Sequence, residues 1–241
     1  MDILYVVGTG SKWNNKELKY SLRSIDKNGV NVGRIFIATE TLPKFINPEK
    51  VVHYPIRDLG KIKHLNIMDK IEGVMRHTDI GDDFLLSSDD HFYIRETDFD
   101  NYPLYYKGEI ENKRDDSEYW RSLRDTKHLL QINGLSVFAT NPHCNTHFNR
   151  PLYERYKWLI AEGKRLSCCA EVNCLMGNIL IAEGVEPTAY KDVKVRRFDS
   201  REELEGMLAD AHCFSIYDSA LKCGMKEYLR ELFPNKSRWE V

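Results

Sequence analysis

Apolar residues recur along this chain with two periods, one typical of strands and one typical of helices. Short runs rich in β-branched and aromatic residues predict strands over 2–8, 34–38, 51–54 and 84–86. Leucine, isoleucine and methionine at helical spacing predict helices over 16–27 and 62–75. The resulting β-α-β-β-α-β order predicts an α/β fold, with a mostly parallel central sheet flanked by helices.

The second half of the chain is richer in predicted helices. We expect helices over 120–130, 151–162, 170–183, 200–208 and 219–232, and strands over 135–139, 193–198 and 213–216. Residues 108–118 are highly charged and poor in apolar side chains, which fits either a mobile lid or a solvated connection. No clean linker divides the 241 residues, so a single domain with a helical C-terminal part is expected.

Composition narrows the class of protein. Hydrophobic residues make up 42% and charged residues 30%, and the net charge of -2 gives no general attraction to nucleic acid or anionic membranes. No apolar run can span a bilayer, and residues 1–7 lack the basic start of a signal peptide, so we expect a cytoplasmic protein. The six cysteines lack zinc-site spacing and are interpreted as reduced thiols.

The strongest chemical signal follows the strand predicted at 84–86. Asp89 and Asp90 fall at its carboxyl end, where open α/β sheets bind ligands. Adjacent carboxylates repel each other and favour a hard cation, Mg²⁺ or Mn²⁺, which can neutralise a diphosphate. We predict His212 as a third metal ligand and His91 as a ligand or substrate contact. The alternatives are an acidic turn for the pair and a core-edge position for His212.

Candidate nucleotide contacts come from three segments. Gly8, Thr9 and Gly10 follow the first strand, where backbone amides can approach a base or phosphate. Arg23, on the first helix, suits bidentate phosphate contact. Lys63 and Asn66 lie at the start of the second helix, whose N-terminus favours anions. For Arg23 and Lys63 the alternative is ordinary charge decoration of a surface helix.

Polar residues concentrate in the loop 141–151, and they predict sugar recognition. His143, Asn149 and Arg150 are assigned to substrate binding, while His147 is assigned to catalysis with Asp90. Glu171, flanked by apolar residues on the next helix, is the candidate general base. Its alternative role is a helix N-terminal acid that stabilises the helix dipole.

The first third of the chain resembles a known family. The likeness is carried by Glu-Leu-Lys-Tyr-Ser-Leu-Arg-Ser-Ile at 17–25, the Asp89-Asp90 pair, and residues 2–7, 34–39 and 43–47. Residues 2–94 resemble the Stealth family of capsular-polysaccharide phosphotransferases and the wider glycosyltransferases with a GT-A nucleotide-sugar fold. Where Stealth proteins open with a tryptophan-valine-aspartate turn, this chain has Val7-Gly8-Thr9-Gly10, which favours glycosyl transfer over sugar-phosphate transfer.

The resemblance implies a single GT-A-like domain, with a nucleotide-binding half over 1–95 and an acceptor-binding half over 96–241. It implies a metal-dependent transferase that uses a nucleotide-sugar donor. Residues 214–240 resemble the tails of small bacterial and phage glycosyltransferases, some of which modify DNA bases, so the acceptor is expected to be a glycan, a small molecule or a modified DNA base. Stealth-type sugar-1-phosphate transfer and a non-catalytic nucleotide- or sugar-binding module are the alternatives.

Overall fold

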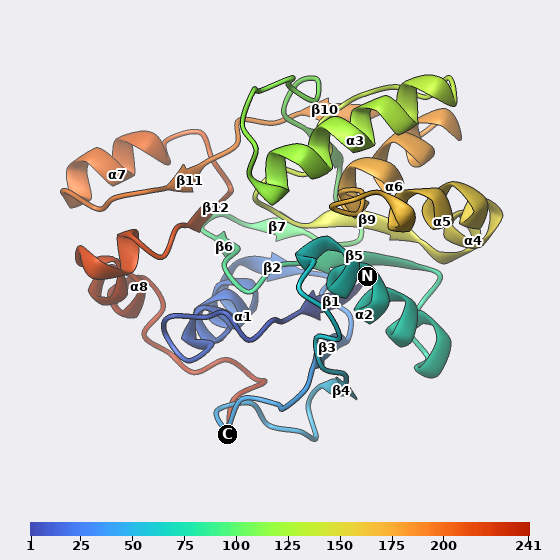
Figure 1. Cartoon of the computed structure of the whole chain (residues 1–241). Coiled ribbons are helices and arrows are strands. Elements are labelled where there is room, and N and C mark those ends of the chain that lie inside the picture. The colour runs from blue at the N-terminus through green and yellow to red at the C-terminus, as the bar shows by residue number, and fades with distance from the viewer.

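Five strands form the central sheet in the order β4-β3-β1-β5-β9, as Figure 1 shows. The computed structural model covers residues 1–241. The first four strands run parallel and β9 runs antiparallel to β5. Their bounds are β1 (Asp2–Val6), β3 (Ile35–Thr39), β4 (Val52–Pro55), β5 (Asp83–Ser87) and β9 (Thr146–Asn149). The mostly parallel sheet with flanking helices confirms the predicted α/β class.

Alternation of side chains along the strands makes two cores, one on each face of the sheet. Leu4, Phe36 and Phe84 face one side, which is covered by α2 (Lys63–His77), α3 (Glu118–Ile132), α5 (Lys157–Arg165) and α6 (Val172–Ala182). Ile3 and Leu85 face the other side and pack against α1 (Lys16–Asn28). Both faces are therefore buried, which is why the strands read as continuous apolar runs.

A smaller sheet forms a third core beside the first helix. Its strands lie in the order β11 (Lys194–Val195), β12 (Cys213–Ile216) and β6 (Phe92–Tyr93). The helices α7 (Arg201–Met207) and α8 (Met225–Leu232) and the 3-10 turn η1 (Ala220–Lys222) pack on it, and they form the orange and red lobe in Figure 1. Because β6 comes four residues after β5, the two sheets are joined directly.

Short elements complete the fold. The remaining strands pair in parallel as β2 (Gly29–Val30) with β7 (Thr97–Asp98) and β8 (Leu104–Tyr106) with β10 (Pro187–Ala189). The helix predicted over 151–162 is two helices, α4 (Arg150–Arg155) and α5, separated at Tyr156. The helix predicted over 219–232 is interrupted at Gly224, whose φ of 90° is left-handed. No helix of the chain is both long and apolar enough to pass through a membrane.

The strand predicted over 135–139 is reduced to a single bridge. Phe138 forms an isolated antiparallel bridge with Glu109, and backbone hydrogen bonds join residues 137–139 to residues 107–110. The segment is also bonded by the amide of Asn178 on α6. Its Oδ1 accepts from Phe138 N at 2.9 Å, and its Nδ2 donates to Phe138 O at 2.8 Å. Ser136 Oγ and Cys174 O complete the four hydrogen bonds of this fully buried amide. The backbone of the predicted strand is thus satisfied partly by a short bridge and partly by a side chain.

Candidate active site

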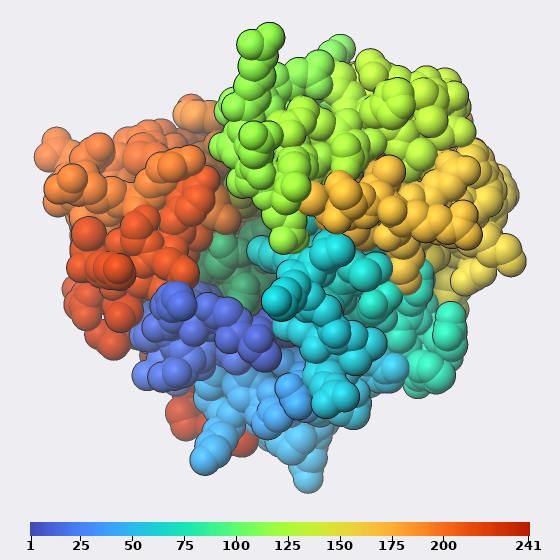
Figure 2. Space-filling view, in the orientation of Figure 1, coloured from blue at the N-terminus to red at the C-terminus, as the bar shows by residue number.

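The strand order reverses between β1 and β5, and this places two loops at one edge of the sheet. From β1 the chain moves to β3 and β4 on one side, then returns through α2 to β5 on the other side of β1. A reversal of this kind leaves a crevice at the carboxyl ends of the strands. Figure 2 shows a central hollow there, with residues 8–15 (blue), the start of α2 (cyan), the loop near 110 (lime) and the β11 region (orange) around a green floor.

The floor of the hollow is the tight turn Ser88–His91, which we call the acid turn. The N–H of His91 donates to Ser88 O at 3.4 Å, and the N–H of Ser88 donates to His91 Nδ1 at 3.4 Å. Asp89 and Asp90 occupy the two corners between them. His91 is only 5% exposed, so the structure gives it a part in shaping the turn rather than the predicted substrate contact.

Like charges accumulate on the acid turn. Burial, together with the neighbouring carboxylates of Asp90 and Glu17, raises the pKa of Asp89 to about 7, while the charge of Lys63 opposes them. Burial also raises the pKa of Glu17, whose carboxylate accepts from Ser11 Oγ at 2.8 Å. These acids face one another across the gap between the loop after β1 and the acid turn, and a cation placed among them would relieve the repulsion.

A lysine from the small sheet neutralises part of this charge. Lys194 Nζ lies 3.5 Å from Asp90 Oδ2. The register explains the contact, because Lys194 is paired with Ser215 and the antiparallel pairing of β12 with β6 places Ser215 level with His91. The same register shows why His212 is not a third metal ligand. It falls level with Ile94, on the side away from Asp90, among the rings of Tyr93, Tyr102, Tyr105 and Tyr190.

A histidine held by a carboxylate lies at the same edge. His143 Nδ1 is 2.8 Å from Asp192 Oδ2, and the backbone N–H of His143 donates to Asp192 Oδ1 at 2.7 Å. Lys107 Nζ lies 3.0 Å from Asp192 Oδ2. Burial raises the pKa of Asp192, but the His143 hydrogen bond and the Lys107 charge outweigh it and hold the pKa well below its usual range. The carboxylate thus fixes the imidazole with Nε2 free to meet a ligand.

The ring of His143 is neutral near pH 7. Burial lowers its pKa below the ordinary value, and the hydrogen bond that Nδ1 donates to Asp192 offsets this only in part. The charges of Lys194 and Lys107 lower the pKa further. His143 also acts on the pKa of His91, as Asp90 and Lys194 do, so the ring of His143 lies near the acid turn. A neutral imidazole with one nitrogen held by a carboxylate is suited to accept a proton.

The predicted nucleotide contacts after β1 lie at the hollow. Gly8, Thr9 and Gly10 are exposed, and their backbone N–H groups donate no hydrogen bond within the chain. The strand end below them is fixed by Lys70, whose Nζ donates to Val7 O at 2.9 Å and lies 2.7 Å from Asp58 Oδ1. The loop therefore offers free amides on a rigid base.

Two other predicted nucleotide contacts are wrong in position. Arg23 is 9% exposed, and its guanidinium binds both carboxylate oxygens of Glu240 and the carbonyls of Phe233 and Pro234. It anchors the C-terminal segment on α1. Asn66 binds the backbone at Leu59 and Gly60, so it closes the turn before α2.

The N-terminus of α2 is also partly occupied. The backbone N–H of Lys63 donates to Glu118 Oε1 at 2.9 Å, so a carboxylate of α3 already fills the place predicted for a phosphate. The Lys63 side chain, which acts on the pKa of Asp89, remains available to the hollow.

Three residues predicted from the loop 141–151 lie away from the hollow. His147 points from mid-strand β9 to the carbonyl of Tyr102, on the face opposite Phe148. Asn149 caps α4 and donates to Asp83 at 2.7 Å, and Arg150 Nε donates to Asp82 at 2.9 Å. Since β9 runs antiparallel to β5, its end lies at the opposite edge of the sheet, and the predicted substrate and catalytic roles lose their geometric basis.

Glu171 has the alternative role given for it above, that of an acid at a helix N-terminus, and it also lies near the site. It is the N-cap of α6, with its carboxylate accepting from Cys174 N at 2.8 Å. It is 5% exposed and acts on the pKa values of His64 and Tyr119 at the rim of the hollow. The cap fixes the carboxylate in position and leaves its second oxygen free.

Sequence reasoning missed the residues contributed by the segment before and within β11. Asp192 and Lys194 are single charged residues in a weak strand pattern, and nothing local marks them as neighbours of His143 or Asp90. Only the pairing of β11 with β12 and of β12 with β6 brings them to the hollow. Glu17 lies within an amphipathic helical pattern that gives no sign of a site, although it falls in the first turn of α1, next to the strand ends.

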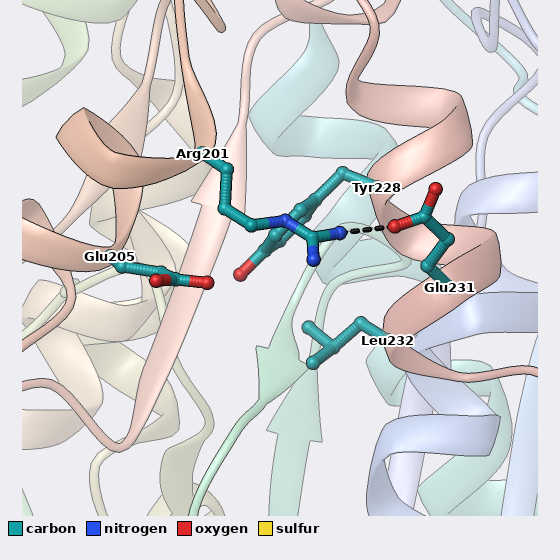
Figure 3. A pocket seen from close by; sticks show the side chains of 5 residues that line it. All are labelled: Arg201, Glu205, Tyr228, Glu231 and Leu232. Carbon is teal, nitrogen blue, oxygen red and sulfur yellow. Dashed lines mark hydrogen bonds and ion pairs between the residues drawn. The ribbon is translucent and has the colours of Figure 1, made fainter.

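A second depression lies between α7 and α8 (Figure 3). Arg201 bonds Glu231 and lies over the ring of Tyr228, 5.6 Å from its centre. Glu205 and Leu232 complete the lining. The one cation of the depression is thus already paired, and the carboxylate of Glu205 is its only free charged group.

The sequence matches no protein-family model, and no curated protein matches it.

Proposed function

We propose that this chain is a metal-dependent glycosyltransferase that moves a sugar from a nucleotide-sugar donor to a hydroxyl or amino acceptor. One observation carries the proposal. The acid turn, the free amides after β1 and the carboxylate-held His143 meet at the edge where the strand order reverses. A cation-binding pair, an anion-binding loop and a proton acceptor are the parts that this reaction needs. The GT-A resemblance of residues 2–94 points the same way.

The donor set fits a cation held by two carboxylates and does not fit one held by three protein side chains. No group of three histidine, cysteine or acidic side chains is placed to share an ion. Mg²⁺ in phosphate-transfer sites is commonly bound by one or two carboxylates, with phosphate oxygens and water supplying the rest. Asp89 and Asp90 would hold Mg²⁺ or Mn²⁺ in that way. When bound, the ion supplies Lewis-acid stabilisation of the departing diphosphate.

The chain's own cations would bind the remaining phosphate charge. Lys63 lies close enough to Asp89 to act on its pKa, and Lys194 pairs with Asp90, so both ammonium groups line the floor of the hollow. Displacing Lys194 from Asp90 onto a phosphate would free that carboxylate for the ion. The backbone N–H groups of Gly8, Thr9 and Gly10 would bind the nucleotide next to them.

His143 is the general base of the proposed reaction. Asp192 holds the proton on Nδ1, which leaves the lone pair of Nε2 to take the proton of the acceptor hydroxyl. As that O–H bond breaks, the oxygen bonds to the anomeric carbon of the sugar. The bond from the anomeric carbon to the phosphate oxygen breaks, and its electron pair leaves with the nucleoside phosphate.

The first test is thermal stability against UDP-, GDP- and CMP-linked sugars, with and without Mn²⁺. A ligand that binds the native state raises the Tm by mass action. We expect one donor to raise the Tm only when the metal is present. Failure of every donor to shift a folded sample would overturn the proposal.

Variants then separate binding from turnover. Asp90→Asn should abolish the metal-dependent shift, whereas Asp83→Asn, in a second acidic pair at the opposite end of β5, should leave it intact. His143→Gln should keep the donor shift and lose donor turnover, including slow donor hydrolysis, by about 100-fold or more. Release of a nucleoside diphosphate fits glycosyl transfer, while a monophosphate from a UDP- or GDP-linked donor would indicate sugar-1-phosphate transfer. A donor that shifts the Tm but is never consumed would indicate a binding module.

A further inference from the structure

A second group of polar side chains meets at the rim of the hollow, and we call it the polar subsite. It comprises His64 in the first turn of α2, Tyr119 in the first turn of α3, Asn141 in the loop before β9, and Glu171 at the N-cap of α6. His64, Asn141 and Glu171 are 6%, 8% and 5% exposed, while Tyr119 is 39% exposed. Three buried polar groups thus lie beneath one accessible aromatic ring.

Tyr119 ties the subsite together. Its ring stacks on the imidazole of His64, with centroids 6.3 Å apart and planes inclined by 25°. Its hydroxyl receives a hydrogen bond from Asn141 Nδ2 at 3.3 Å. The charge of Glu171 raises the pKa of both His64 and Tyr119, so its carboxylate lies near the subsite.

Two buried polar atoms of this group have no hydrogen-bond partner. They are His64 Nδ1 and Asn141 Oδ1, and both belong to side chains that contact Tyr119. An unmet buried polar atom is costly, and folded proteins rarely keep one without a ligand or an ordered water to satisfy it. The fold therefore maintains, beneath an accessible ring, hydrogen-bonding capacity that the chain itself does not use.

The chemistry of these groups selects a neutral ligand rich in hydroxyls. Asn141 Oδ1 and the Glu171 carboxylate need donors, and His64 Nδ1 can donate or accept according to its tautomer. A hydroxyl does both, and adjacent hydroxyls on a ring can serve several such atoms at once. An anion would be repelled by Glu171, and an apolar ligand would leave the unmet atoms unsatisfied. The exposed face of Tyr119 suits the C–H face of a sugar ring.

We propose that the polar subsite binds the sugar ring of a substrate, an inference that rests on the proposed glycosyl transfer. The first turn of α2 links the two places, because Lys63 acts on Asp89 while the next residue, His64, lies under Tyr119. A diphosphate at the acid turn would lie on one side of this turn of helix and the sugar on the other. The ring is that of the donor or of the acceptor, and the experiment separates the two.

The experiment compares matched ligands by calorimetry in Mn²⁺, using UDP against UDP-glucose and GDP against GDP-mannose. In the wild type we expect the sugar conjugate to bind more tightly than the bare diphosphate. Asn141→Leu should weaken the affinity for the sugar conjugate by about 3- to 10-fold, which is the contribution of one uncharged hydrogen bond. The affinity for the bare diphosphate should stay unchanged. Because Asn141 Oδ1 is unpartnered in the fold, this variant should fold normally, and unfolding in urea checks it.

Tyr119 supplies a second pair of variants. Tyr119→Phe keeps the stacking face and should lose little of the sugar gain, whereas Tyr119→Ala should lose most of it. Free glucose, galactose, mannose and ribose form the other arm, observed by ligand-detected NMR with and without diphosphate. A loss in Asn141→Leu seen with free sugars and not with conjugates assigns the subsite to the acceptor.

The outcomes separate the two proposals. If diphosphates bind, and both the conjugates and the free sugars bind Asn141→Leu and wild type equally, the subsite holds ordered water only, and the sugar inference fails while the proposed function stands. If no diphosphate binds but free sugars bind the wild type and not Asn141→Leu, the subsite is supported and the nucleotide-dependent function fails. If no sugar binds in either form, the inference is overturned.

Discussion

Replacing Arg23 by methionine should destabilise the protein strongly, because Arg23 is the buried anchor of the C-terminal segment. Its Nε and Nη2 bind the two oxygens of Glu240 at 2.7 and 2.9 Å, and the two side chains are 9% and 2% exposed. Methionine fills the volume of the aliphatic stem but leaves the Glu240 carboxylate buried, with Lys19 at 3.3 Å as its remaining cation.

The magnitude follows from the burial of the remaining charge. Removing one partner of a buried ion pair costs about 3–5 kcal/mol, and Lys19 reduces this toward the lower figure. A loss of about 3 kcal/mol in the free energy of unfolding corresponds to a fall in Tm of about 6–12 °C for a chain of this length. Urea unfolding followed by circular dichroism measures the loss directly, with an unchanged m value.

A neighbouring ion pair provides the control. Arg238, on the same segment, pairs with Asp26 but is 56% exposed, so Arg238→Met should cost less than about 1 kcal/mol. The double variant Arg23→Met with Glu240→Met should recover part of the loss, since it removes the stranded charge. Equal losses from Arg23→Met and Arg238→Met would refute the buried-charge reasoning. A loss of nucleotide binding in folded Arg23→Met would reopen its predicted phosphate contact.

Three further changes test the packing and the buried polar groups. A Cβ on Gly177 would lie 2.1 Å from Thr140 Oγ1, so Gly177→Ala should cost more than about 2 kcal/mol, whereas Gly206→Ala, with nothing within 4 Å, should stabilise by about 0.5–1 kcal/mol; similar Tm values for the two would contradict this. Asn178→Leu should cost about 1–3 kcal/mol in urea unfolding, because it leaves the N–H of Phe138 and the hydroxyl of Ser136 without their acceptor, and an unchanged free energy of unfolding would count against the role of the amide in holding this segment. Burial lowers the pKa of His212 to about 4, so the unfolded chain takes up this proton first, and the free energy of unfolding falls as the pH drops from about 6.5 toward 4. The stability of His212→Phe relative to the wild type should therefore rise between pH 7 and pH 4.5, and an unchanged difference in the free energy of unfolding would show that His212 does not titrate in this way.

Local sequence pattern was sufficient for the four parallel strands of the central sheet, but it missed the fifth strand, β9, which lies within the polar stretch expected to be a loop. Ile35–Thr39 is buried throughout, and its apolar run has no competing interpretation. At 135–139 the pattern predicted a full strand, whereas the structure has one isolated bridge to Glu109 and hydrogen bonds from the amide of Asn178, 40 residues away. Periodicity reports burial, and it does not say which group satisfies the backbone.

The candidate site was predicted in its acidic core and missed in its surroundings for a related reason. Asp89 and Asp90 are recognisable in the sequence as adjacent charges after an apolar run, and their place at the strand end follows from the fold class. The pairing register of the small sheet places Lys194 beside Asp90 and His212 away from it, and the sequence does not encode this register locally. Arg23 looked free because its partner, Glu240, lies 217 residues further along the chain.

The acid turn is also the covalent joint between two separate sheets. Four residues, Ser88–His91, connect β5 of the central sheet to β6 of the small one. Lys194 on β11 reaches back across this joint to Asp90. A tilt of the α7–α8 lobe against the main body would therefore move the residues that carry the carboxylates, together with the other segments that join the lobe to the central sheet. Binding of a ligand at the acid turn and the orientation of the α7–α8 lobe are therefore coupled.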